Sequence, residues 1–558
     1  MREDLFTEQL REDIFTLQQQ HGASYLDTRT GRTLRWAVVT AYLDLLLRGV
    51  GLASQAGAIG GVFFIVLVLR SAPTAELEPV LLRSRRLVTA SGIGLIVAQC
   101  LALAIQLESL ADERGWPVRE FVGTTYFAAS VVRIAACVGL VMGCRMIGRG
   151  RGRTGAWIAL ACSVVLTAGS AGMSHAVGRL DRRALLLGLD TLHQLAASVW
   201  VGGLVHLAAA AFRRGEQFWP PGVLRRFSAT ALGAVAMLVL AGVGIAFFYV
   251  DGPQALLGTG YGAMIVTKGV MLTGLLGLGG ANFLTVRRRG GPSEVSLVRV
   301  QRFVETELGL GLVVLFVAAS LTSLPPAVDV MAERATLVEI GARMAPRWPT
   351  LRSPTIEELP VPDRDTPKAA EDRAWSEYNH HVAGLFVLAM GLLATAQGLR
   401  WARWARHWPL IFLGLAGFLF VRNDPETWPR GALGFWESLT DPVVFQHRVF
   451  VLLIVAFGVF EWSVRLGRFR TKGYALIFPL LCAVSGGLLL AHTHSADDLK
   501  EQLLIELSHL QLGLLAIFVA WARWLELRLP SPDDRLPGRL WAVGLTLVGF
   551  FLLIYRET

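Results

Sequence analysis

The sequence predicts an all-α, polytopic membrane protein, a transmembrane bundle of about fourteen helices. Two observations predict this class. First, 53% of the 558 residues are hydrophobic and only 17% are charged, whereas soluble proteins carry about 25% charged residues. Second, the charges are confined to short blocks between apolar runs of about 18 to 30 residues, and a helix needs ~20 residues to cross a hydrocarbon core. Because a backbone in lipid must satisfy its hydrogen bonds internally, these runs are helices and not open strands.

The expected spans divide into eight, a polar segment and six more. The first eight lie near residues 38–69, 87–107, 121–147, 154–175, 184–212, 224–250, 257–286 and 301–324. The other six lie near residues 378–399, 407–422, 443–464, 474–492, 500–526 and 538–555. Residues 327–376 are rich in proline and charge, which predicts an extramembrane linker between membrane modules at 36–326 and 377–558. Residues 1–35 are charged and lack an apolar core, which predicts an amphipathic arm on the membrane surface and not a signal peptide.

The distribution of arginine predicts the orientation. The loops after spans 1, 3, 5, 7, 9, 11 and 13 are rich in arginine, and such loops usually stay in the cytoplasm. Both termini are therefore expected outside, in the periplasm of a Gram-negative cell. These loops also account for the net charge of +10, so the charge points to the lipid bilayer and not to nucleic acid. The five cysteines lie in apolar runs without a CxxC pair, which argues against a disulfide framework or a zinc site.

With this orientation, most of the eleven histidines fall in the outer half of the membrane. They are His175 and His193 in the first module, and His380, His381, His447, His492, His494 and His509 in the second. Imidazole is the commonest metal ligand in proteins, and polar groups at membrane depth usually line a cavity, pair or bind something. The histidines therefore indicate either a metal-handling protein or helix ends anchored at the headgroups.

The sharpest local pattern lies around the fifth expected span. Asp190 and His193 are three residues apart and share a helix face, so the carboxylate is expected to fix the imidazole tautomer, as it does at metal sites. Met173 and His175 lie at a helix end, where both side chains are able to turn toward one point, and a thioether with an imidazole suits Cu(I). His206 lies about 20 Å further along the span than His193, which favours a hydrogen bond between helices there.

The run from Asp190 to Leu204, D-x-L-H-x-x-A-A-x-x-W-x-G-G-L, resembles the copper resistance protein D (CopD) family of bacterial inner-membrane proteins. Its glycine pair also predicts a point of close helix packing. Other agreeing pieces are Gly123-Thr124-Thr125-Tyr126, Arg133, Thr267-Lys268, Ala281-Asn282-Phe283 and Arg302-Phe303-Val304-Glu305, so the resemblance covers about residues 36–326. It implies an eight-helix module that takes up or transfers copper from the periplasm, often beside a small periplasmic copper-binding protein. It also implies functional roles for His175, Asp190 and His193, whereas Met173 is added from ligand chemistry.

Charged residues inside the first module need partners of their own. Asp44 and Arg48 are four residues apart in the first span and are expected to pair. Arg133, Lys268 and Glu305 indicate an interior network or a proton path, and structural pairing is the favoured interpretation.

The second module resembles no family that we identify from the sequence, and three interpretations stay open. In the first interpretation, its outer-face residues form a second copper site. In the second, paired histidines ligate haem b. In the third, these residues make a structural network. Glu506 and His509 repeat the spacing of Asp190 and His193. The absence of a CxxCH motif excludes c-type haem.

Together these patterns predict a copper transport or copper-handling protein that is not an enzyme. Cu(I) is the favoured ion, and the expected metal-binding residues are those named above in both modules. The main rivals are a haem-containing electron-transfer protein and a copper-binding assembly factor that does not transport. The sequence has no Walker motif, so ATP is not expected to be a direct energy source.

Overall fold

The structure is a computed structural model that describes residues 30–69, 77–114, 118–147, 151–211, 219, 222–287, 294–359, 370–399, 401–439, 442–469, 471–491 and 499–557. Every regular element in these ranges is a helix, which confirms the all-α class. The described residues include 14 helical segments long and apolar enough to cross a membrane, the predicted number. The predicted surface arm lies outside the described residues, apart from residues 30–35 at the start of α2.

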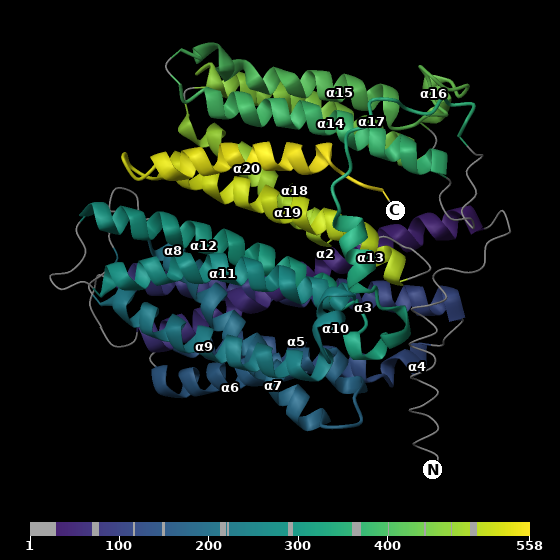
Figure 1. Cartoon of the computed structure of the whole chain (residues 1–558). Coiled ribbons are helices and arrows are strands. Elements are labelled where there is room, and N and C mark those ends of the chain that lie inside the picture. Colours follow the sequence, from purple (N-terminus) through teal and green to yellow (C-terminus); the bar gives the residue numbers. More distant parts are fainter. Residues whose placement is uncertain are drawn as a thin grey trace. The chain divides into compact units, whose positions relative to one another are not determined.

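Contacts divide the chain into two units, with the boundary between Arg334 and Ala335 and the start of α19 grouped with the first unit. In Figure 1 the long helices of each unit run roughly parallel to one another. The spans of the first unit are built from α2 (Thr30–Phe63) with the π-helical turn η2 (Phe64–Leu69), α3 (Glu78–Arg114), α5 (Thr125–Ile147), α6 (Gly152–Ala171), α7 (Arg183–Ala197) with η5 (Ser198–Gly202) and α8 (Gly203–Ala211), α9 (Val223–Tyr249), α11 (Gly260–Val286) and α12 (Glu294–Leu321). Shorter pieces are α4 (Val118–Val122), η4 (His175–Gly178) and α10 (Pro253–Leu257).

The predicted glycine packing point is confirmed. A Cβ at Gly202 would lie 1.7 Å from the carbonyl oxygen of Ala56 on α2, and one at Gly60 would lie 2.5 Å from the Cα of Gly202. Only glycine allows the two backbones this approach. Close by, His206 on α8 is fully buried, and its Nε2 bonds to the carbonyl oxygen of Gly57 at 2.9 Å. The expected hydrogen bond between helices is therefore present.

The second unit is assembled from α13 (Leu337–Met344), α14 (Ala370–Ala396), η8 (Arg403–Leu410), α15 (Ile411–Arg422), α16 (Phe435–Ser438), α17 (Pro442–Arg465), η9 (Lys472–Leu476), α18 (Ile477–Ala491), α19 (Leu499–Arg528) and α20 (Arg535–Leu553). Its core is aromatic, with Trp408, Phe478 and Trp541 packed around one another. The helices α14 and α20 lie along each other. Glycine allows their backbones to approach closely, since a Cβ at Gly391 would lie 2.5 Å from the Cα of Thr546.

Of the predicted linker, the structure describes residues 327–359 and residues 370–376, and the latter already belong to α14. Residues 327–359 make contacts on both sides of the unit boundary. Before the boundary, Asp329 pairs with Arg179 at 2.6 Å, and Arg334 pairs with Asp251 at 2.9 Å. After the boundary, α13 starts with a capping box between Thr336 and Glu339, which satisfies free N–H groups of its first turn. Each half of the segment is thus held by its own unit.

Candidate functional site

The four residues singled out in the first unit lie close together along the chain but face different neighbours. Asp190 and His193 lie on α7. Met173 lies in the turn after α6, and His175 begins the short helix η4, which the hydroxyl of Ser174 caps by accepting from the Ala176 N–H. This cap fixes the backbone between the methionine and the histidine.

His193 is oriented by a backbone carbonyl and not by the expected carboxylate. Its Nδ1 lies 3.0 Å from the carbonyl oxygen of Leu238 on α9, so Nδ1 carries the proton and Nε2 keeps its lone pair. Asp190 instead accepts a hydrogen bond from the Gln194 side chain at 3.2 Å. The imidazole is therefore held in a tautomer that presents a free Nε2 as a metal ligand, and the tautomer role predicted for Asp190 belongs to Leu238.

Asp190 is the negative centre of a group of side chains from four elements. It interacts electrostatically with Lys268, His193 and His175, and with two tyrosines, Tyr249 and Tyr261. The ring of His175 lies 6.5 Å from that of Tyr261, and the two tyrosine rings are 6.0 Å apart. We refer to these six side chains as the Asp190 cluster.

His175 is half-buried at the edge of this cluster, outside the spans. Burial lowers its pKa below the ordinary 6.5, with a partial opposing effect from a hydrogen bond to the backbone of Leu321. Its Nε2 is buried without a hydrogen-bond partner among the described residues. A neutral imidazole with an unused nitrogen is the form that binds a metal ion.

Hydrogen-bonded polar side chains, all neutral except Arg133, connect Asp190 to Met173 through four helices. The Gln55 amide donates to Gln194 at 3.4 Å, and Gln55 in turn accepts from Arg133 at 3.0 Å. Arg133 also donates to Gln99. The chain then continues from Gln99 to Ser130 at 2.9 Å, and Ser130 lies 3.5 Å from the sulfur of Met173. Glutamine inside an apolar span is costly unless bonded, a signal by which the sequence could have revealed these residues.

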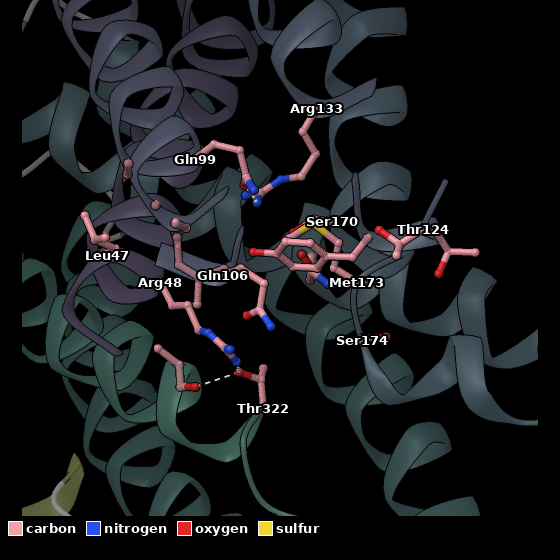
Figure 2. A pocket seen from close by; sticks show the side chains of 18 of the residues that line it. Leu47, Arg48, Gln99, Gln106, Thr124, Arg133, Ser170, Met173, Ser174 and Thr322 are labelled. Carbon is pink, nitrogen blue, oxygen red and sulfur yellow. Dashed lines mark hydrogen bonds between the residues drawn. The ribbon is translucent and has the colours of Figure 1, made fainter. Parts of the chain in front are cut away.

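Met173, together with Gln99, Arg133 and Gln194 of this series of hydrogen-bonded side chains, lines a cavity of about 370 Å³ in the first unit. In Figure 2, Arg133 and Gln99 approach each other on one side of the cavity, and Arg48 and Thr322 lie on another. His175 does not line the cavity; it lies against Tyr261 instead. The structure thus gives Met173 and His175 separate surroundings, although the sequence suggested a common point.

The interior charges of the first unit form separate pairs. Asp44 and Arg48 pair at 2.6 Å, as predicted. Glu305 pairs with Arg302 on its own helix, whereas Arg133 is bound by glutamines and Lys268 faces Asp190. These local contacts agree with structural pairing, the interpretation that the sequence favoured over an interior network or a proton path for Arg133, Lys268 and Glu305.

In the second unit, the contacts of His381 make it a structural residue. It is fully buried. Its Nδ1 accepts from the backbone N–H of Thr350 at 3.1 Å, and its Nε2 donates to the carbonyl oxygen of Tyr555 at 2.8 Å. Both nitrogens are occupied, so no lone pair is available to a metal in this arrangement.

The other predicted histidines of this unit have distinct partners. His380 donates from Nδ1 to the Ser376 carbonyl oxygen at 2.8 Å and stacks on Tyr555. His447 bonds Asp424 at 2.6 Å, and His509 lies 3.0 Å from the Ile505 carbonyl oxygen. His492 and His494 lie outside the described residues. Within the described ranges, no three His, Cys, Asp or Glu side chains gather as a metal-binding group.

Comparisons with known proteins give two matches. Residues 221–321 match the family model of copper resistance protein D, CopD, which confirms the resemblance over α9 to α12. The chain is 30% identical over 284 residues to copper transport protein CutJ of Bacillus subtilis (strain 168), covering 48% of this chain and 50% of that protein. The chain thus spans about half the length of this curated relative. No solved structure matches the chain.

Proposed function

We propose that this chain, which carries a CopD segment, is a multi-pass protein of the bacterial inner membrane that handles copper ions. Three findings support the proposal: the fourteen apolar helices, the family match, and the copper transport protein among its relatives. The observation that carries it is the His193 tautomer. A backbone carbonyl holds Nδ1, which leaves the lone pair on Nε2, and Asp190 acts electrostatically on the same imidazole.

In the proposed mechanism, Met173 and His175 are separate binding points for Cu(I) at the periplasmic face, and the ion passes from His175 to His193. Thioether and imidazole are suitable ligands for Cu(I), and the charge of Asp190 offsets that of the ion. Few ligands gather at any one point, which suits cargo that must leave again, because conduction requires weak, sequential sites. The protein thus moves or holds copper without covalent chemistry. A small periplasmic copper-binding protein is the proposed donor or acceptor.

The His193→Ala variant tests the site. We expect its copper affinity to fall by about 10- to 100-fold or more, since the loss of even an outer-shell partner has this effect at metal sites. Copper per purified chain, measured by mass spectrometry, is the readout. His407→Gln is the matched control, because His407 belongs to the second unit, is bonded to Trp462 there, and is not one of the predicted metal ligands. Equal copper content in both variants and the parent would reject the site.

Copper uptake into proteoliposomes separates transport from an assembly role. We expect flux that His193→Ala abolishes, and binding without flux would favour the assembly factor. An optical spectrum of the purified protein tests the haem alternative for the second unit. A Soret band with stoichiometric iron would replace the copper interpretation there.

A further inference from the structure

The cavity of the first unit has an unusual charge balance. Among the described residues that line it are two arginines, Arg48 and Arg133, and no aspartate, glutamate, histidine or cysteine. Arg48 is neutralised by Asp44 at 2.6 Å. The net positive charge at the cavity wall therefore comes from Arg133.

Arg133 is a deeply placed cation without a carboxylate. It is 6% exposed and lies eight residues into α5 from Thr125, which is about 12 Å along the helix. Its hydrogen bonds go to the amide oxygens of Gln55 and Gln99. Within the described part of the chain, no acidic side chain pairs with it or acts on it electrostatically.

The glutamines are fixed so that they solvate the guanidinium without neutralising it. The Gln99 amide nitrogen is bound by Ser130, and that of Gln55 by Gln194, so both oxygens point to Arg133. A bonded charge at membrane depth still needs a counter-charge to offset its desolvation. The other interior arginine of this unit near the cavity, Arg48, has one; Arg133 has an open cavity instead.

We propose that this cavity binds a small organic carboxylate, which supplies the missing negative charge to Arg133. A guanidinium is the side chain best suited to hold a carboxylate. Around the polar groups the wall is apolar, with Leu47, Leu52 and Phe121 among its residues, so it accommodates the apolar body of the ligand. The volume of about 370 Å³ is within the range of small-molecule sites. The ligand is either a water-soluble carboxylate or a fatty acid from the bilayer.

The carboxylate site shares one residue, Met173, with the proposed copper ligands, whereas His175 and His193 do not line the cavity. Its test therefore uses copper-free protein kept in a chelator, so that its failure is distinguishable from failure of the copper proposal. The full-length protein in detergent is titrated calorimetrically with acetate, butyrate and octanoate, and with the matching neutral amides acetamide, butyramide and octanamide.

We expect a carboxylate to bind at least about tenfold more tightly than its amide, since hydrogen bonds between ions are roughly twice as strong as neutral ones. Arg133→Gln should remove this difference, and Arg133→Lys should restore part of it. Affinity that rises up to octanoate identifies a fatty acid as the source, and affinity that is already maximal at butyrate identifies a water-soluble acid. Equal binding of acid and amide, or no binding of either, would overturn the proposal.

A second variant keeps the test valid if Arg133→Gln does not fold. Ala102 is buried and lines the cavity, so Ala102→Leu fills its apolar part without changing any charge. We expect this variant to lose octanoate while it keeps acetate. Octanoate binding that is unaffected by Ala102→Leu would place the ligand elsewhere and contradict the assignment.

Discussion

At the residue scale, hydrogen bonds to backbone carbonyls decide what each histidine is able to do. The carbonyl oxygen of Leu238 leaves one nitrogen of His193 free, whereas Thr350 and Tyr555 occupy both nitrogens of His381. The two residues are of the same type, and both were expected in the outer half of the membrane. Their difference lies in backbone groups of other segments, and residue types do not encode the position of such groups. The sequence therefore predicted both as ligands.

The contact at Gly202 leads to a stability prediction. We expect Gly202→Ala to destabilise the protein by about 1–3 kcal/mol, the usual effect of overpacking, because its Cβ would overlap the Ala56 carbonyl. Denaturation in detergent measures the effect. Gly188→Ala on the same span is the control, since a Cβ there meets nothing within 4 Å and alanine favours the helix by up to about 1 kcal/mol. Equal stability of both variants would show that α2 shifts enough to accommodate the added Cβ without a loss of stability.

The polar chain from Asp190 to Met173 also has a central residue that is open to test. Gln55 is 1% exposed and bonds both Gln194 and Arg133. Gln55→Leu leaves an interior guanidinium with one partner fewer, which we expect to cost about 1–3 kcal/mol of unfolding free energy. Gln106→Leu is the control, because Gln106 lines the same cavity but is not part of the hydrogen-bonded series from Asp190 to Met173. A similar melting temperature for both variants would contradict the structural importance of that series.

At the element scale, the helices were predictable and the segment between the units was not. Each span is marked by its apolar run, so every predicted span corresponds to a helix. The residues after the boundary between the two units are rich in proline and charge, a composition typical of a solvated linker. Arg343 nevertheless bonds the Leu504 carbonyl oxygen at 2.7 Å and the Tyr555 hydroxyl at 3.2 Å. Such long-range partners leave no periodic pattern in a sequence.

These contacts predict that α13 is held in place by Arg343. In Arg343→Ala we expect amide hydrogen exchange in α13 to accelerate about tenfold or more, because three hydrogen bonds to a charged group, with Leu504, Ser508 and Tyr555, are lost. Exchange measured by mass spectrometry reports this directly. Arg352→Ala, an exposed position in the same segment, should leave exchange unchanged. Unaltered protection in Arg343→Ala would mean that apolar contacts alone hold the helix.

At the scale of the whole molecule, the distribution of arginine still predicts an orientation with both termini outside. Alkaline phosphatase fused to the carboxyl terminus should be active, and a green fluorescent protein at the same point should be dark. Insertion at Gly467, in an expected cytoplasmic loop, should give the reverse pair of signals. The opposite pattern at both points would mean that the protein has the inverted topology, with the proposed capture residues on the cytoplasmic side.

The pairing of α14 with α20 has a consequence for biosynthesis. His381 bonds a carbonyl 174 residues later in the chain, so α14 leaves the ribosome roughly 10 to 35 s before this partner at typical rates of synthesis. During that interval the glycine face of α14 and the Nε2 of His381 lack their final partners, whereas Glu377 and the Nδ1 of His381 bond Arg347 and Thr350, which precede α14 in the chain. Slower translation of the second unit would lengthen the exposure of this face to quality-control proteases.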